Sequence, residues 1–434
     1  MTQYEKSAAT LELPAILEML ARHAVSDAAK ERALALSPAT DAATVKRLLA
    51  ETSAARGMMV KRGSPSFSGV KDVRASLSRA DMGGTLNIRE LMDIAGVLTA
   101  ARMARSYAAG DGRGNEKTCI DGLFNSITTN RFLEDKISGS IAAEDELADS
   151  ASPELASIRR LIRAASARVR EALQKIISSP SYSKALQDPI ITTRSERYVV
   201  PVKAEFKNTV PGLVHDVSAS GATLFIEPMA AVKANNELRE LEYAERREVV
   251  KVLSAFTESI RPDAEAIADA GDYLSSVDMI RAKARWALAN DAGKPILSTD
   301  DRLELRTARH PLLQQTLRAQ GREVVPLDLA LDRRKHILVI SGPNAGGKSV
   351  CLKTTGLMQY LFQCGYPVPA SEVSELPVFR SIFIDIGDEQ SIDDDLSTYS
   401  SHLLNMKNML SGASSSALVL IDEFGSGTEP VIGG

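Results

Sequence analysis

The chain of 434 residues is poor in cysteine, with three in all. Cys119, Cys351 and Cys364 have the spacing of neither a zinc site nor a disulfide framework. The sequence therefore excludes a small fold held together by metals or disulfides. So few cysteines fit a reducing compartment, and we expect a cytoplasmic protein.

Long apolar runs are also missing. No stretch of 18 apolar residues occurs, and the N-terminus lacks the basic start and apolar run of a signal peptide. We therefore expect no membrane span and no secretion signal.

The formal net charge of −4 is small, so overall charge does not indicate nucleic-acid binding, and any such site has to be a local patch. No repeat with a period of 20–50 residues is present, which excludes a solenoid.

What is present is a change of pattern along a chain long enough for two to four domains. Apolar residues recur at helical spacing through the first half, and a basic helix is predicted from Pro153 to about Ile177. Short β-rich runs follow. After Pro228 a long charged helix begins, which we expect to form an antiparallel pair with the segment reaching about Asn290. From about Pro295, β runs alternate with helical stretches, as in a parallel α/β sheet. The expected strands are Ile190–Thr193, Tyr198–Val202, Leu213–Val217, Thr223–Ile226, Arg302–Thr307, His336–Ser341, Val378–Ile386 and Ala417–Ile421.

The predicted fold class is a multidomain protein, with a helical core and lever that carry a small β insert, followed by an α/β domain. We place the helical core at residues 1–189 and the β-rich insert at 190–228. The long helical arms take residues 229–295, and the α/β domain takes 296–434.

The α/β domain contains a phosphate-binding pattern, G-x-x-x-x-G-K-S. An apolar run precedes it and a potential helix follows it, which is the strand–loop–helix setting that the pattern requires. Glycines let backbone N–H groups turn toward phosphate oxygens, and the new helix presents its positive end to the anion. Lys348 is expected to reach the β- and γ-phosphates and Ser349 to hold Mg²⁺. The alternative, a glycine-rich turn with an exposed lysine, is disfavoured by the flanks. The predicted site for ATP and Mg²⁺ consists of Gly342, Pro343, Asn344, Ala345, Gly346, Gly347, Lys348 and Ser349.

A second apolar run, Leu418–Ile421, ends in two acids. In P-loop enzymes such a strand lies beside the first, so Asp422 is predicted to support the metal. Glu423 is the predicted general base that orients the attacking water. A buried strand followed by a polar turn is the alternative.

Between the two motifs, Ser397 is placed to cap a helix, and a hydroxyl-rich helix start can also receive a phosphate.

Three motifs in combination resemble the MutS family of DNA-handling ATPases: Ser341–Ser349, Ser397–His402 and Ile421–Pro430. Arg309–Leu313 resembles the opening of that family's ATPase domain. Ser218–Pro228, with the sequence SASGATLFIEP, resembles the second bacterial branch of the family. That branch is associated with suppressing homologous recombination and rescuing collided ribosomes, not with mismatch repair.

The resemblance implies a P-loop ATPase domain at 296–434 and a homodimer with composite ATP sites. The phosphate loop binds the nucleotide of its own subunit, Asp422 and Glu423 serve the metal and the water, and Ser397 and Thr398 reach the γ-phosphate of the partner's nucleotide. ATP binding then closes the dimer and hydrolysis releases it. The helical arms carry this closure to a clasp on branched DNA or on the ribosome and its rRNA.

The chain also departs from the family pattern. It shows no Phe-x-Glu wedge and has no room for mismatch-recognition and connector domains, which argues against a mismatch sensor. It ends at Gly434, whereas the family's ATPase domain continues and this branch adds a C-terminal nuclease domain. We therefore expect a C-terminally truncated chain with an incomplete ATPase domain, and nuclease activity only in a full-length parent.

Basic residues suggest where nucleic acid is contacted, and the contacts are expected to read phosphates and shape instead of base edges. They are those of the helix Arg159–Lys175 together with Arg194, Arg197, Lys203 and Lys207. A solvated helix face is the alternative.

Two other functions stay open. One is a transporter-type or chromosome-organising ATPase, although such proteins carry Leu-Ser-Gly-Gly where this chain has Ser-Thr-Tyr-Ser-Ser. The other is a non-catalytic scaffold in which nucleotide only sets dimerisation.

Overall fold

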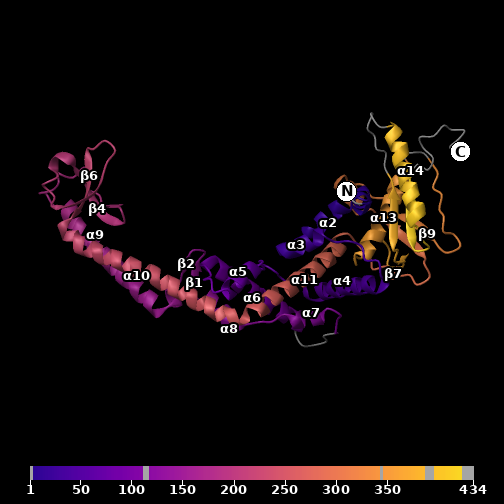
Figure 1. Cartoon of the computed structure of the whole chain (residues 1–434), viewed down its shortest axis with the longest axis horizontal. Coiled ribbons are helices and arrows are strands. Elements are labelled where there is room, and N and C mark those ends of the chain that lie inside the picture. Colours follow the sequence, from indigo (N-terminus) through magenta and orange to yellow (C-terminus); the bar gives the residue numbers. More distant parts are fainter. Residues whose placement is uncertain (1–2, 111–116, 343–345, 387–394, 423–434) are drawn as a thin grey trace. The chain divides into compact units, whose positions relative to one another are not determined.

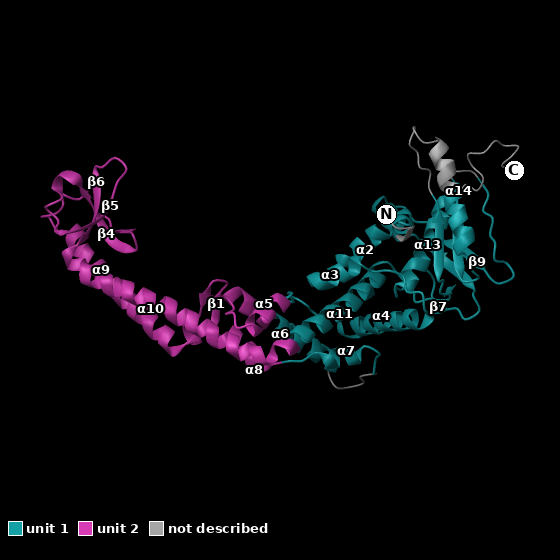
Figure 2. Ribbon diagram, viewed as in Figure 1, with its two compact units in different colours: residues 1–72, 96–129, 267–434 teal, residues 73–95, 130–266 magenta. Residues whose placement is uncertain are grey.

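The computed structural model describes residues 3–110, 117–342, 346–386 and 395–422, with the backbone alone for 3–4 and 395–402. The chain divides into two compact units, shown in Figure 2: unit 1 is Met1–Asp72, Gly96–Thr129 and Ile267–Gly434, and unit 2 is Val73–Ala95 and Asn130–Ala266. The protein is multidomain and mostly helical, with several small sheets. The four successive domains stay a prediction, because the units group residues by packing and not by order along the chain. None of the described helices is long and apolar enough to cross a membrane.

Unit 2 is built on a pair of long helices, α9 (Pro153–Ile177) and α10 (Met229–Ile260), which are joined by a four-stranded antiparallel sheet (Figure 1). Arg159 pairs with Glu245 and Arg168 with Glu237, so numbering rises along α9 as it falls along α10 and the helices are antiparallel. The sheet has the order β3-β4-β6-β5. The other elements of unit 2 are α5 (Arg74–Asp81), α8 (Arg131–Ser138), β1 (Ile141–Ala143), β2 (Glu146–Leu147), β3 (Thr192–Arg194), β4 (Arg197–Lys203), β5 (Gly212–Val217), β6 (Thr223–Pro228) and the 3₁₀ turns Asp149–Ala151, Ala204–Phe206 and Arg261–Asp263.

The sequence located these elements correctly but gave α10 the wrong partner. The basic helix and the four strands of the insert are confirmed. However, α10 packs along α9, which precedes it, and not along the segment that follows it. The sheet between α9 and α10 reverses the chain and turns the two apolar stripes toward each other. An apolar stripe shows which face of a helix is buried, but it does not show what buries it.

Unit 1 contains the predicted phosphate loop and the largest core. Its helices are α1 (Gln3–Thr10), α2 (Leu13–Ala21), α3 (Asp27–Leu34), α4 (Ala42–Arg62), most of α6 (Ile88–Ala109), α7 (Asp121–Ser126), nearly all of α11 (Ala264–Ala289), α12 (Pro311–Ala319), α13 (Lys348–Gln363) and α14 (Asp395–Gly412). Its strands are β7 (Ile296–Leu297), β8 (Leu303–Ala308), β9 (Leu327–Leu331), β10 (Glu375–Leu376), β11 (Ser381–Asp385) and β12 (Ala417–Ile421).

The predicted parallel sheet is confirmed only for β11 and β12. These strands pair in parallel from Ser381↔Ala417 to Asp385↔Ile421. A separate sheet, β7-β10-β8-β9, is mixed, since only β7 and β10 run parallel. The predicted strand at 336–341 is wrong: the segment has no strand structure, and Ile337 and Val339 are 76% and 83% exposed. Its apolar run predicts burial, but no described strand pairs with it.

The core of unit 1 forms where α11 meets the C-terminal end of α13. Trp286 and Tyr366 are fully buried and pack edge to face, with ring centroids 5.3 Å apart. Next to them, the buried Lys283 donates from Nζ to the carbonyl oxygen of Cys364, the C-cap residue of α13, at 2.7 Å. A cation at this end complements the negative end of the helix dipole, so Lys283 fixes α13 to α11.

Burial lowers the pKa of Lys283 from 10.5 to about 8. The unfolded chain therefore binds this proton more tightly than the folded chain, and the contribution of Lys283 to the free energy of unfolding rises between pH 8 and pH 10.5. Burial also raises the pKa of Cys364 to about 12 and raises the pKa of Tyr366. These two groups act in the opposite direction, since their folded forms hold protons that the unfolded chain releases.

Comparing the wild type with Lys283→Met separates these effects, because both chains keep Cys364 and Tyr366. Between pH 7 and pH 9 we expect the stability of the wild type to rise relative to the variant by about 1 kcal/mol. The chain has a single tryptophan, so the thermal transition of Trp286 fluorescence reports on this core. A difference between the two chains that does not change with pH would contradict the prediction.

Candidate functional site

The predicted phosphate loop leads directly into α13. Gly347 is the N-cap of this helix, and its φ of 86° is a left-handed conformation that favours glycine. Lys348 begins the helix and is half-buried, whereas Ser349 is exposed in its first turn. The start of α13 thus presents its backbone N–H groups, the positive end of the helix dipole and an exposed hydroxyl to an anion. Gly342 and Gly346 are also exposed, while Pro343, Asn344 and Ala345 lie outside the described residues.

Helix α13 is solvent-facing at its start and buried from Thr354 onward. A Cβ atom on Gly356 would lie 2.8 Å from a methyl carbon of Leu11 and 2.9 Å from one of Leu420. The helix backbone therefore approaches β12 closely, because this glycine has no side chain. This packing fixes the phosphate-loop helix against the strand that leads to the predicted metal ligand.

Asp422 follows the last residue of β12. Its backbone N–H donates to the carbonyl oxygen of Asp385 at 2.8 Å, which extends the pairing of β11 and β12 by one bond. Leu418 and Leu420 face the core that contains α13, and the two-residue period of a strand carries Asp422 to that same face. This placement puts the predicted metal ligand on the face of the sheet that packs against α13. Glu423 lies outside the described residues.

Ser397 and Thr398 lie within α14, which is helical from Asp395 onward. The prediction that Ser397 caps this helix is therefore wrong, since it is at least the third helical residue. Acidic residues are favoured in a first helical turn, and the run of acids at 393–395 allows the helix to begin upstream of Ser397. The side chains of Ser397 and Thr398 are outside the described part of the chain.

Sequence reasoning missed Asp385. This carboxylate is the last residue of β11, is only 5% exposed, and accepts a hydrogen bond from Asn405 Nδ2 of α14 at 3.0 Å. It forms part of no motif that the sequence showed. The available signal was an acid inside the apolar run Val378–Ile386, where a buried charge needs a partner.

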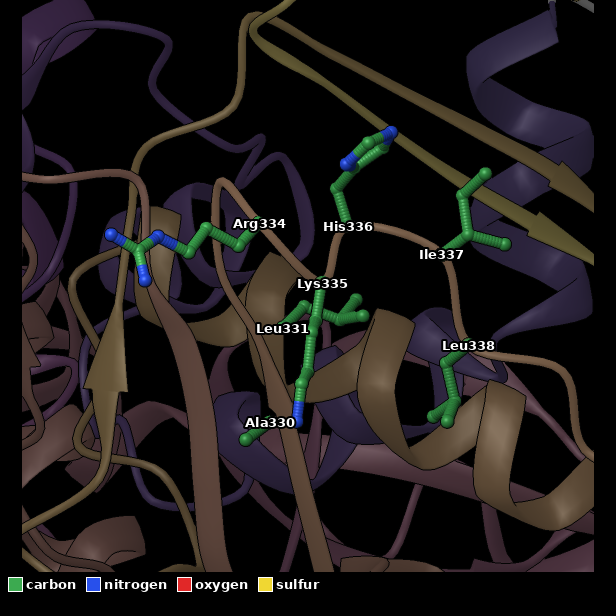
Figure 3. Close-up of a pocket in the computed structure, with 7 residues that line it drawn as sticks. All are labelled: Ala330, Leu331, Arg334, Lys335, His336, Ile337 and Leu338. Atoms are coloured by element: carbon green, nitrogen blue, oxygen red, sulfur yellow. The ribbon is translucent and has the colours of Figure 1, made fainter.

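A cavity of about 410 Å³ lies just before the phosphate loop. Figure 3 shows the side chains of Lys335 and Leu338 on one side of the segment and those of His336 and Ile337 on the other. The large apolar residues Ile337 and Leu338 remain exposed, so the cavity is an open surface feature.

Most of the basic residues proposed for nucleic acid are paired with acids of unit 2. In α9, Arg159 lies 2.6 Å from Glu245, and ion pairs also engage Arg163, Arg168 and Lys175. In contrast, Arg160 and Lys207 are exposed and make no ion pair within the described residues. The charge available to phosphates is therefore smaller than the sequence indicated.

Arg197 forms part of a buried ion-pair cluster in unit 2. It binds both carboxylate oxygens of the fully buried Glu227, at 2.7 and 2.9 Å. His215 Nε2 lies 2.6 Å from the same carboxylate, and Asn235 Nδ2 donates to it at 2.8 Å. This cluster connects β4, β5, β6 and α10 around one buried charge, so Arg197 is engaged in the fold.

Comparison with known proteins places these features in a family context. Residues 338–433 match the family described as MutS domain V. The chain is 42% identical over 430 residues to a protein named Endonuclease MutS2 from Acetivibrio thermocellus, an alignment that covers 99% of this chain and 54% of the relative. It is 41% identical over 429 residues to the protein of that name from Ruminiclostridium cellulolyticum, with 99% and 53% covered. For the one from Pelotomaculum thermopropionicum the identity is 43% over 429 residues, with 99% and 54% covered. The chain thus spans about half the length of the curated relatives it matches.

Substituting two helical glycines tests the packing of α13 on β12. We expect Gly356→Ala to destabilise unit 1 by roughly 1–3 kcal/mol, since the added methyl group overlaps Leu11 and Leu420. Gly57→Ala in α4 is the matched control, because its Cβ would meet nothing within 4 Å, and it should stabilise by roughly 0.5–1 kcal/mol. Thermal unfolding followed by Trp286 fluorescence measures both. Equal effects of the two substitutions would contradict the close approach.

Proposed function

Because the chain belongs to the MutS family and is of the MutS2 type, we propose that it is a magnesium-dependent ATPase that works as a homodimer on nucleic acid. The observation that carries the proposal is the arrangement of α13, which begins at Lys348 after the left-handed Gly347 and packs on the strand that ends at Asp422. This supports a phosphate site and an acid on the same side of one short sheet.

We assign the roles as follows. Residues 342–349 bind the phosphates, and Lys348 neutralises the β- and γ-phosphates. Ser349 and Asp422 hold Mg²⁺, which supplies charge neutralisation when it is bound, and the exposed hydroxyl and half-buried carboxylate fit that ion. Glu423 orients the attacking water. Ser397 and Thr398 of each subunit complete the site of the other, so that ATP closes the dimer and hydrolysis opens it.

The proposed targets are branched DNA, with suppression of homologous recombination as the outcome, and collided ribosomes, which a nucleotide-gated clasp would split through contacts to rRNA. Both present dense phosphate and a defined shape, which suits the exposed cations of unit 2. The relatives are named endonucleases, and we propose nuclease activity only for proteins of their full length. The proposed location is the cytoplasm.

A second candidate is a non-catalytic scaffold, in which ATP binding sets dimerisation without turnover. The exposed apolar segment at Ile337–Ile340 favours it for this chain, because the predicted phosphate loop begins from a segment that pairs with no strand in the described part of the chain. A transporter-type or chromosome-organising ATPase is less well supported, because the signature of those families is missing before β12.

Lys348→Ala is expected to weaken binding of a fluorescent ATP analogue with Mg²⁺ by roughly 10- to 100-fold, since it removes a charge-assisted contact to phosphate. Lys353→Ala is the matched control on the same helix. Its ammonium lies 3.2 Å from Glu12, and its loss should change affinity by no more than about twofold. Equal affinities of Lys348→Ala and the wild type would refute the phosphate site.

Comparing turnover in the wild type and in Glu423→Gln then separates the two candidate functions. An ATPase should lose hydrolysis in the variant while it keeps ATP binding. A scaffold should bind ATP without hydrolysis in either chain.

Arg160→Gln and Lys207→Gln test the nucleic-acid surface. If each cation contacts one phosphate, each substitution should lower the slope of log affinity against log salt by about 1 for a four-way DNA junction. Lys175→Gln is the control, because Lys175 already pairs with Glu171 at 3.0 Å. An unchanged slope in both variants would remove these residues from the interface.

A further inference from the structure

Helix α14 is fixed to strand β11 at two points. Asn405 donates a hydrogen bond to the buried carboxylate of Asp385 at 3.0 Å. Two helical turns later, a Cβ on Gly412 would lie 3.0 Å from the ring of Phe383, so the helix closely approaches the strand there as well. The first contact is directional and the second is steric. A hydrogen bond to a carboxylate therefore sets the axial position of α14 along the sheet.

The two faces of the β11–β12 sheet are used differently. Ile384 and Leu420 lie in the core cluster that also contains residues of α13. Phe383 and Asp385 belong to the opposite face, toward α14. The carboxyl edge of the sheet thus places Asp422 on the side of the phosphate-loop helix and Asp385 on the side of α14. The bond from the Asp422 N–H to the Asp385 carbonyl, at 2.8 Å, connects these two residues directly.

Asn405 lies eight residues after Ser397 and seven after Thr398 in one continuous helix. At a rise of 1.5 Å per residue, that separation is about 12 Å, or roughly two turns along the helix axis. A shift of α14 at Asn405 is therefore passed to Ser397 and Thr398 along a stiff element.

We propose that Asp385 is a positioning residue for the ATPase site and that, through Asn405, it sets the reach of Ser397 and Thr398 toward the partner's nucleotide. This rests on the proposed function, in which those two residues act across the dimer. In this role Asp385 acts through Asn405 and is assigned no contact to phosphate or metal. It connects the sheet edge that carries Asp422 with α14, the helix whose Ser397 and Thr398 act in the partner's site. The two parts of the composite site therefore keep a fixed position relative to each other.

An exchange of donor and acceptor, with a second-site rescue, provides the test. Asn405→Asp places two carboxylates against each other and breaks the bond. Adding Asp385→Asn restores it with donor and acceptor exchanged. Asn408→Ala is the matched control, since Asn408 is an exposed residue of the same helix. Each 434-residue chain is mixed with Mg²⁺ and a non-hydrolysable ATP analogue. Analogue affinity is measured by fluorescence and dimerisation by sedimentation velocity.

We expect Asn405→Asp to keep the analogue affinity within twofold, while dimerisation with analogue weakens at least tenfold. Any drop of the Trp286 unfolding midpoint caused by the two facing carboxylates should be reversed in the double variant. The double variant should dimerise like the wild type, and so should Asn408→Ala. Adding Ser397→Ala to Asn405→Asp should weaken dimerisation by less than the product of the two single effects, because both substitutions disable the same contact.

Three outcomes decide against the proposal in distinguishable ways. Wild-type dimerisation by Asn405→Asp overturns the positioning role and leaves the proposed function standing. Loss of dimerisation without rescue by Asp385→Asn also overturns it, because the effect then does not run through this bond. A wild-type chain that binds the analogue but stays monomeric overturns the composite site, and with it the role of Asp385.

Discussion

Helix α13 has to present its N-terminus to solvent and bury almost everything else, and the arrangement of unit 1 depends on this constraint. Its first turn is exposed around Ser349, whereas every residue from Thr354 to Gln363 is buried. Such a helix needs close neighbours, and Gly356 allows β12 and Leu11 to approach its backbone. At the other end, the buried ammonium of Lys283 satisfies the carbonyl of Cys364. The proposed phosphate site is therefore the open end of a helix that is held rigidly along its length.

The short parallel sheet gives this helix a counterpart. One face of β11 and β12 packs into the core with α13, and the other carries α14. The two acids at its carboxyl edge are thus divided between two helices, one leading to the phosphate loop and one to the residues proposed to act in trans. A two-stranded sheet can do this because successive side chains on a strand point to opposite faces.

Unit 2 shows how little a count of basic residues says about an interface. Arg159 and Arg168 hold α9 to α10 through acids, and Arg197 neutralises the buried Glu227. Removing a partner from a buried charge costs far more than losing an exposed ion pair, so Arg197 belongs to the fold. Arg160 and Lys207, two exposed residues that pair with no acid in the described part of the chain, were not distinguishable from the others in the sequence.

The sequence by itself determined what depends on local chemistry. The helix after the predicted phosphate loop and the strand before Asp422 follow from glycine spacing and short apolar runs, because the backbone conformations they need are specified by neighbouring residues. Other features were decided only by tertiary structure. They include the packing of α10 against α9, the exposure of Ile337 and the hydrogen bond between Asp385 and Asn405. They also include the ion pairs of Arg159 with Glu245 and of Arg197 with Glu227. Except at Ile337, which pairs with no described strand, the partner lies many residues away. An apolar stripe or a charge shows that a residue needs a partner without showing which one the fold supplies.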